Sequence, residues 1–475
     1  MQFNNAAYYI FLIAVFFAFW SAASRAHLRV WLIAAAGCFF YYQTAGRALA
    51  LMIAVSIIDF ATTRGMSRSE NARTRKLWLA VSLTVDTGAL VFFKYADFFL
   101  ENLAGGLSFF GVTIPVGPLN LIVPIGISFF IFQSLAYVID VYRRDAEPAR
   151  SYIDYLAFIS FFPTIIAGPI LRAKQLLPQL RSRLTLTPEA GGQALFLIAT
   201  GLIKKIAIAD YLSANLVDRV FDFPERFSSL EVLAAVYGYA LQIYCDFSGY
   251  SDIAIGSALL LGFALPVNFD SPYRSRNLAE FWRRWHISLS TWLRDYVFFT
   301  IAGRRARNAM MLYFGLVATM TIGGLWHGAM WTFALWGLMH GAGLAVFRAF
   351  EAVKKKFSFE PLNARAASIA AALLTFHFVC LAWIFFRADS VEKVFSVIGQ
   401  LTAMSADAAN LPVSVIGVMI VGFLAHFAPD AVWEKSRDGF ARLPAIAQAC
   451  VIAVVAAGLY SVASSDVAPF IYSRF

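Results

Sequence analysis

The sequence predicts an all-α polytopic membrane protein with roughly ten to twelve transmembrane helices. Of its 475 residues, 60% are hydrophobic and only 14% are charged, whereas about a quarter of the residues of a soluble globular protein are charged. Apolar runs of roughly 17 to 23 residues recur along the chain, which is the length that a helix needs to cross a bilayer core. No soluble domain, repeat or low-complexity linker interrupts them, so residues 1–475 are expected to form one integral membrane domain.

The charged residues lie mainly in short segments between the apolar runs. The formal net charge is +10 at pH 7, which in a soluble protein would suggest a nucleic-acid partner. The positive-inside rule explains the same charge, because cytoplasmic loops of membrane proteins are enriched in Lys and Arg. We therefore expect a lipid bilayer and no nucleic acid as a partner, with segments 64–76, 143–150 and 270–307 in the cytoplasm and both termini outside.

The first apolar run extends from Tyr8 to Trp20 and resembles the core of a signal peptide. Neither Lys nor Arg precedes this run, and Arg25 and Arg29 follow it. This charge order predicts a retained first helix with its N-terminus outside.

The runs near 77–98 and 119–142 are expected to cross the membrane and to be joined by an outside loop whose only charge is Glu101. The run at 152–171 contains two prolines and a glycine, and basic residues flank it on both sides. This pattern favours a re-entrant segment over a full crossing, because non-helical backbone is tolerated at membrane depth only where protein or water surrounds it. Further spans are expected near 192–210, 230–247, 310–325, 328–348, 366–386, 412–428 and 445–462.

The stretch "EFWRRWHISLSTWLRDY" at 280–296 has aromatic and aliphatic residues at helical spacing, including Trp282, Trp285 and Leu289. A polar stripe with Arg284 lies opposite them. The pattern predicts an amphipathic helix that lies in the membrane interface. Such a helix does not explain His286, which falls on the apolar side and is therefore a candidate for an interior site.

The stretch "GGLWHGAMWTFALWGLMHG" at 323–341 places His327 and His340 in a run without any other ionisable group. Its glycines predict that His327 lies where a helix ends or begins, with His340 inside the next helix. Ionisable residues within membranes usually face a cavity and mark a functional path. The neighbours Trp326, Gly328 and Trp331 favour that interpretation for His327. For His340, a hydrogen bond to a neighbouring helix explains the residue equally well.

The stretch "YCDFSGYSDIAIG" places Asp246 and Asp252 in an apolar context. Carboxylates there are costly unless they are paired or hydrated. Contact with a substrate and a structural role, such as pairing with Arg or capping a helix, both remain open. The basic residues around Arg284 could attract an anionic substrate, although membrane topology alone also explains them.

Common catalytic motifs are absent from the sequence, which contains no GxSxG, Walker A, GxGxxG or HExxH pattern. The four cysteines form no CxxC pair, so neither a disulfide framework nor a metal site is expected. A buried histidine as the best catalytic candidate indicates proton chemistry on a bound hydroxyl, since histidine can act as a general base near neutral pH.

Four motifs together resemble the membrane-bound O-acyltransferase (MBOAT) family and span residues 161–341: "FFPTIIAGPI", "YCDFSGYSDIAIG", "NFDSPYRSRNLAEFWRRWHISLSTWLRDY" and "GGLWHGAMWTFALWGLMHG". The wording is similar to the bacterial polysaccharide O-acetylase branch, typified by alginate O-acetyltransferase. The resemblance implies helices around a central funnel, with His327 as the catalytic histidine and His286 as the second family histidine. Trp326, Asp246, Asp252 and Arg284 are the residues expected to contact substrates.

The resemblance further implies a protein of the cell inner membrane that takes an acyl group, expected to be acetyl, from a cytoplasmic thioester. Acetyl-CoA or an acyl carrier thioester would be the donor, with no bound cofactor. The group would pass toward hydroxyls of an exported polysaccharide through a periplasmic partner protein. Two alternatives are a transporter or channel without chemistry and a polysaccharide-export scaffold. The first predicts paired carboxylates and broken helices in repeated halves, and the sequence shows no such symmetry. The second needs no buried histidine.

Overall fold

The computed structural model describes residues 1–113, 117–304, 306, 308–358 and 363–462. Throughout these residues the regular secondary structure is helical, without β-strands, which confirms the predicted all-α class. The chain divides into two compact units, called unit 1 (Met1–Thr187 with Ser257–Leu265) and unit 2 (Pro188–Gly256 with Pro266–Phe475). The expectation of one integral domain over residues 1–475 stays a prediction.

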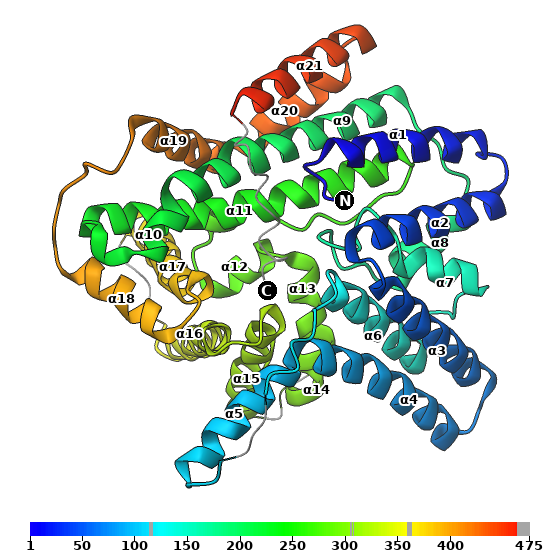
Figure 1. Ribbon diagram of the computed structural model, residues 1–475, viewed down its shortest axis with the longest axis horizontal. Helices are drawn as coiled ribbons and strands as arrows, with labels where there is room; N and C mark the ends of the chain where they lie inside the picture. Colours follow the sequence, from blue (N-terminus) through cyan, green and yellow to red (C-terminus); the bar gives the residue numbers. More distant parts are fainter. Residues whose placement is uncertain (114–116, 305, 307, 359–362, 463–475) are drawn as a thin grey trace. The chain divides into compact units, whose positions relative to one another are not determined.

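Among the described residues, unit 1 contains the helices α1 to α8, which Figure 1 labels. They are α1 (Ala6–Ser21), α2 (Ala26–Ala45), α3 (Ala48–Arg68), α4 (Ala72–Leu90), α5 (Ala96–Phe109), α6 (Ile127–Arg143), α7 (Tyr152–Ile159) and α8 (Ala173–Arg181), with the π-helical turn η1 (Val91–Tyr95) between α4 and α5. Side-chain caps begin several of them. Asn71 accepts hydrogen bonds from the first backbone N–H groups of α4, and Ser151 does the same for α7.

Part of the loop predicted around Glu101 is wrong, because helix continues from α4 through η1 and α5 to Phe109 and includes Glu101. Most residues of this part are compatible with a helix. The described residues between Phe109 and α6 form turns and non-helical backbone, and the outside location of this connection stays a prediction. The next helix, α6, begins at Ile127 and not near 119, after Gly126 adopts a left-handed backbone with φ +80°. That conformation favours glycine and starts the helix there.

The segment predicted to be re-entrant does not form a full-length helix. Helix α7 has only eight residues, which is about 12 Å at 1.5 Å per residue and too short for a bilayer core. Turns and extended backbone follow to residue 172, and nearly all of these residues are buried. The absence of a continuous helix is confirmed, and the path of this segment in a membrane stays a prediction.

Unit 2 contains the remaining helices. They are α9 (Pro188–Leu202), η2 (Ile203–Asp210), η3 (Ser213–Val217), α10 (Asp218–Asp222), η4 (Pro224–Arg226), α11 (Ser229–Leu260, whose last turn belongs to unit 1), η5 (Pro272–Arg274), α12 (Leu278–Arg284), α13 (Ile287–Trp292), η6 (Leu293–Phe298), α14 (Phe299–Ala302), α15 (Ala309–His327), α16 (Trp331–Lys356), α17 (Ala364–Arg387), α18 (Val391–Thr402), α19 (Val413–Phe427), α20 (Asp430–Ala441) and α21 (Ala445–Val462).

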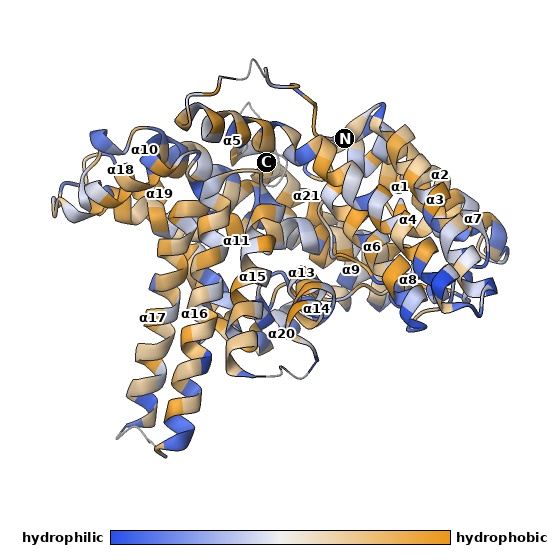
Figure 2. Cartoon of the chain, turned by 90° about the horizontal axis from the view of Figure 1, so that it is seen from below, coloured by the Kyte–Doolittle hydropathy of each residue, from blue (hydrophilic) through white to orange (hydrophobic). Residues whose placement is uncertain are grey.

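Among the described residues, six helices are long and apolar enough to cross a membrane, or up to seven if the pair α19 and α20, bent by 93°, forms one span. The polytopic class is confirmed with fewer clear spans than the predicted ten to twelve. Several predicted spans correspond to helices that are short or that carry charge, such as the run at 192–210, which divides into α9 and η2. Figure 2 shows the apolar length of α16 and α17, which becomes hydrophilic at the far end of this hairpin.

The amphipathic helix predicted at 280–296 is wrong as a single element. The helix breaks at His286, whose φ of +41° lies in the left-handed region, and continues as α13 and η6. Its aromatic residues pack inside unit 2 and do not face lipid, since Trp285 is only 1% exposed. The apolar periodicity of this segment is present, but it reflects the burial of apolar side chains on both sides of the break between α12 and α13.

Helices α15 and α16 form a close antiparallel pair within unit 2, because early residues of α16 contact late residues of α15 and later residues of α16 contact earlier ones. A Cβ atom on Gly324 would overlap the carbonyl oxygen of Phe333, and one on Gly337 would overlap that of Met320. Glycine at both positions therefore lets the two helix backbones approach each other. This contact fixes the short connection at 328–330, which follows His327.

Candidate active site

His327 is the last residue of α15, and the chain turns at Gly328 before α16 begins at Trp331. The predicted position at a helix end is therefore confirmed. The side chain is 3% exposed. Its ring centroid lies 4.9 Å from that of Trp326, 5.2 Å from that of Trp336 and 5.1 Å from that of Phe386. Three aromatic rings thus form a rigid slot around the imidazole.

Gly328 contributes to this slot through its lack of a side chain. A Cβ atom at this position would overlap the ring of Phe333, which itself lies 6.4 Å from the ring of His327. The backbone at Gly328 is extended, so the requirement is for space and not for an unusual dihedral angle. Any larger residue would displace an aromatic wall of the slot.

His286 is fully buried at the break between α12 and α13. Its Nδ1 lies 3.3 Å from Oδ1 of Asn268, and Ser288 donates to the same oxygen from both its hydroxyl and its backbone N–H, at 2.9 and 3.1 Å. The amide orientation is fixed because the backbone N–H of Ser288 can only donate, so the atom that it contacts is the amide oxygen; Asn268 Nδ2 then donates to Ser251 at 3.2 Å. Since an amide oxygen only accepts, His286 donates through Nδ1–H, and Nε2 is the basic nitrogen of its neutral ring.

The structure brings His286, Trp326 and His327 together. The ring of Trp326 lies 6.3 Å from that of His286 and 4.9 Å from that of His327. These residues come from the break after α12 and from the end of α15, so they meet only in the folded chain. The three predicted residues with aromatic rings therefore form one cluster.

His340 lies in α16, as predicted, and is buried. Its Nδ1 accepts a hydrogen bond from Nε1 of Trp282 at 3.2 Å. Of the two roles considered for His340, the structure therefore contains the hydrogen bond to a neighbouring helix. The ring also lies 4.9 Å from Trp336, which forms a wall of the His327 slot. His340 thereby connects α12 to the helix that carries this wall.

The carboxylates predicted on α11 are both paired with lysines of η2. Nζ of Lys205 lies 2.6 Å from Asp246 and 2.7 Å from Asp210, and Nζ of Lys204 lies 2.7 Å from Asp252. The pairing role left open in the sequence is thus present, with lysine in the place of the expected arginine. Sequence reasoning missed both lysines, although charged residues inside the apolar run at 192–210 are a signal that partners must exist.

Arg284 lies at the end of α12 and is engaged by two carboxylates. Its Nε lies 3.3 Å from Glu280 and its NH1 group lies 3.2 Å from Asp270. The positive charge of Arg284 is therefore largely balanced within unit 2. Contact with a substrate stays a prediction for this residue.

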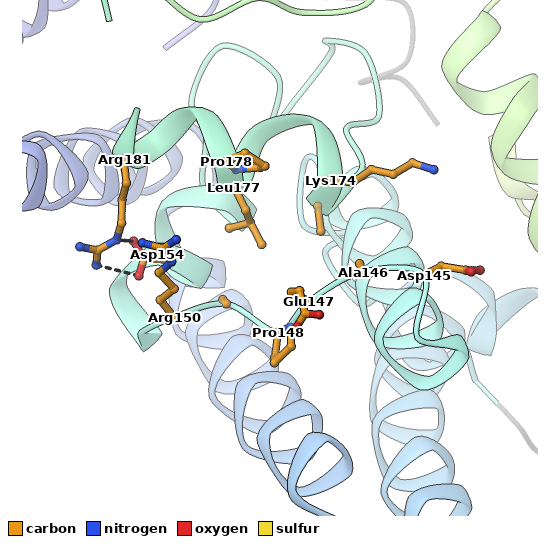
Figure 3. Close-up of a pocket in the computed structure, with 12 residues that line it drawn as sticks. Asp145, Ala146, Glu147, Pro148, Arg150, Asp154, Lys174, Leu177, Pro178 and Arg181 are labelled. Carbon is orange, nitrogen blue, oxygen red and sulfur yellow. Dashed lines mark hydrogen bonds and ion pairs between the residues drawn. The ribbon is translucent and has the colours of Figure 1, made fainter. Parts of the chain in front are cut away.

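A separate polar pocket lies in unit 1, between the loop after α6 and helix α8, and has a volume of about 520 Å³ (Figure 3). Its charged lining residues are Asp145, Glu147, Arg150, Asp154, Lys174 and Arg181. Both signs are equally represented, so its charge favours neither anions nor cations.

Arg181 forms a two-pronged ion pair with Asp154 in this pocket, with both N···O distances at 2.8 Å (Figure 3). Burial alone would raise the pKa of the Asp154 carboxyl, but hydrogen bonds from Arg181 and Ser151 outweigh it and hold that pKa below its ordinary value. The pair fastens α8 to the start of α7.

A buried imidazole in an aromatic slot, beside a second histidine oriented by an amide, suits proton transfer to and from a hydroxyl in a site that excludes water. This site lies within an all-helical membrane fold. The sequence model of the MBOAT, membrane-bound O-acyltransferase family matches residues 123–387, which enclose all four motifs and both histidines. The chain belongs to this family and is a membrane-bound acyltransferase.

Individual proteins with similar sequences are O-acetylases, O-acetyltransferases and D-alanyltransferases by name. The chain is 33% identical to the "Probable alginate O-acetylase AlgI" of Azotobacter vinelandii over 95% of this chain and 96% of that protein. It is 35% identical to the "Peptidoglycan O-acetyltransferase" of Helicobacter pylori over 79% and 74% of the two chains. It is 32% identical to the "Teichoic acid D-alanyltransferase" of Bacillus subtilis over 57% of this chain and 70% of that protein.

Proposed function

We propose that this protein transfers an acetyl group from a cytoplasmic thioester, across the cell inner membrane, toward hydroxyls of an exported polysaccharide. The observation that carries the proposal is the aromatic slot around His327, joined to His286 through Trp326. The relatives support acetyl as the group, since an alginate O-acetylase aligns with 95% of the chain and a D-alanyltransferase with 57%. Alginate is the first acceptor to test, and peptidoglycan the second.

His327 acts as the general base in this proposal. It accepts the proton of the acceptor hydroxyl while the hydroxyl oxygen attacks the thioester carbonyl carbon. A C–O bond forms, the C–S bond breaks, and the proton passes from the imidazolium to the leaving thiolate. The walls supplied by Trp326, Trp336 and Phe386 exclude bulk water, which limits hydrolysis of the thioester.

His286 assists from its position beside Trp326. Its hydrogen bond to Asn268 sets the ring orientation and leaves Nε2 as the nitrogen that can accept a proton or a hydrogen bond. A role in orienting substrate and a role in proton transfer both use this same nitrogen.

The donor is acetyl-CoA or an acetylated carrier thioester that approaches from the cytoplasm. The basic residues of segment 270–307 support this side of the membrane through the positive-inside rule; residues 305 and 307 of this segment lie outside the described residues. A periplasmic partner that receives the acetyl group completes the path, as the resemblance to the polysaccharide O-acetylases implies.

Purified protein in sealed vesicles tests the proposal. Radiolabelled acetyl thioester is supplied on one face, and acceptor polysaccharide with the periplasmic fraction on the other. A cysteine replacing the exposed Arg304 reports which face carries segment 270–307. We expect alkali-labile acetyl esters on the polymer only when the donor is on the face that carries segment 270–307, as the cysteine at position 304 reports it. Full transfer with the donor confined to the other face reverses the direction, and no transfer in either arrangement refutes the acceptor class.

A further inference from the structure

Two carboxylates lie within the helical core of unit 1, outside the site described above. Asp59 belongs to α3 and Asp86 to α4, and both side chains are 0% exposed. Both helices belong to segments that are long and apolar enough to cross a membrane. Ionised carboxylates in such a place are expensive unless a positive charge accompanies them.

Asp59 is surrounded by hydroxyl groups that donate to it. Ser82 of α4 donates to one carboxylate oxygen, and Ser134 of α6 donates to the other. The hydroxyl of Tyr155 in α7 lies 3.3 Å from that second oxygen. Three donors on one carboxyl group leave it in the role of an acceptor, which favours its ionised form.

Asp86 lies beside Asp59 and Ser134. Both of its oxygens are buried, and neither forms a hydrogen bond of regular geometry within the described part of the chain, although Asp59 and Ser134 lie within reach. No Lys or Arg side chain of the described residues forms an ion pair with either carboxylate. The other titratable groups at the cluster are the hydroxyls of Tyr155 and Tyr137, whose rings stack at 4.6 Å.

Two adjacent negative charges without a counter-charge repel each other strongly in a low-dielectric interior, so like-charged carboxyl pairs usually hold one proton between them. The hydrogen-bond pattern indicates where that proton lies. Asp59 already accepts from three hydroxyls, whereas Asp86 forms no hydrogen bond of regular geometry with the described residues. A protonated Asp86 would supply an O–H donor that can reach Asp59, which lies beside it.

We propose that Asp59 and Asp86 form a binding site for a single dissociable proton within the membrane-spanning part of unit 1. Asp86 carries the proton and Asp59 is the carboxylate that shares it. When the proton is bound, the pair has one negative charge, which the three hydroxyls stabilise. Loss of the proton places two like charges between α3, α4 and α6 and weakens their packing, so the site makes this part of the fold sensitive to rising pH.

Infrared spectroscopy of the purified full-length protein in lipid nanodiscs tests this site without any acetyl transfer, so its outcome is independent of the proposed function. A buried carboxylic acid has a carbonyl stretching band separate from those of carboxylates and amides. We expect wild-type protein to show this band, Asp86→Asn to lack it, and an increase in pH to diminish it. Asp154→Asn is the matched control, because that carboxylate is ion-paired with Arg181 and its removal should leave the band unchanged.

Sodium provides the competing occupant, because hydroxyl and carboxylate oxygens also suit a small cation. We expect the acid band to be insensitive to Na⁺ at constant pH. A wild-type spectrum that Asp86→Asn leaves unchanged overturns the proposal, and so does a band that Na⁺ abolishes. If Asp86→Asn does not fold, Asp86→Glu serves instead, and the same band must then persist at a shifted frequency.

Discussion

The ring of Trp326 lies 6.3 Å from the ring of His286, although the two residues belong to different helical segments. Trp326 also contacts its neighbour His327 at 4.9 Å. One indole therefore connects the two histidines and forms a wall of the slot around His327. This arrangement makes the role of Trp326 testable apart from the acid–base chemistry.

Trp326→Ala should open the slot to water. We expect the rate of acetyl transfer to fall. Hydrolysis of the donor thioester should rise relative to acetyl transfer, because the aromatic wall no longer excludes water. The ratio of thiol released to acetyl ester formed measures this effect. Trp31→Ala, at an exposed tryptophan of α2, is the control and should leave the ratio unchanged. A Trp326→Ala enzyme that transfers less without any increase in that ratio would show that the indole has a different role.

Asn268→Ala should impair transfer by leaving His286 without its orienting acceptor. The loss of one such hydrogen bond, about 1.4 kcal/mol, corresponds to roughly tenfold in rate. We expect the loss in kcat with little change in KM, because Asn268 acts through its hydrogen bond to His286. Asn363→Ala, which removes the cap of α17 at an exposed position, should retain activity. Unchanged kcat for Asn268→Ala would refute the positioning role.

Lys205→Met should destabilise the protein because it removes the ion pairs that Lys205 forms with the buried Asp246 and the partly buried Asp210. Lys205 is 1% exposed and forms ion pairs with Asp246 and Asp210, and breaking a buried pair typically costs roughly 3–5 kcal/mol. Thermal unfolding in detergent measures the change. Lys204→Met should have a smaller effect on stability, since the side chains of Lys204 and Asp252 are both partly exposed. The double variant Lys205→Met with Asp246→Asn should recover part of the loss, and equal stability of wild type and Lys205→Met would contradict this assignment.

The ion pair between Asp154 and Arg181 should give the fold a dependence on acid pH. Because the folded-state pKa of Asp154 is held below its ordinary value of about 3.9, the pair stabilises the fold above that pH. Its contribution is lost as pH falls through the lower folded-state pKa. Wild type should therefore unfold at a higher temperature than Asp154→Asn at pH 7, and the gap should close toward pH 3. A gap that widens on acidification would mean that the carboxyl stabilises the fold in its protonated form.

The position of the main histidine could be predicted from the sequence because the signals are local. The glycines around "GGLWHG" indicated a helix end at His327, and α15 ends there. His340 was likewise placed in the following helix. Apolar run length was sufficient for several later helices, since α17 and α19 differ from the predicted spans by one or two residues at each end, whereas α16 extends eight residues beyond its predicted end.

The partners of the site residues could not be predicted, since they depend on tertiary contacts. Asn268 lies 18 residues before His286 in sequence and reaches it only because the chain turns back at the break after α12. That break was itself hidden, because the apolar periodicity of 280–296 continues across the positive φ of His286. The pairing of Asp246 with Lys205 required knowledge of which helices are neighbours.

The central claim is that His327 accepts a proton during acyl transfer, and His327→Gln tests it most directly. Glutamine keeps a polar side chain of similar reach but cannot take up a proton near neutral pH. We predict that purified, monodisperse His327→Gln loses transfer by about 10²- to 10⁴-fold, the range typical of general acid–base catalysis, and unfolds at the wild-type temperature. His377→Ala, at an exposed histidine that hydrogen-bonds Tyr237, should retain activity. Transfer by His327→Gln at the wild-type rate would contradict the account and leave His327 as a structural residue.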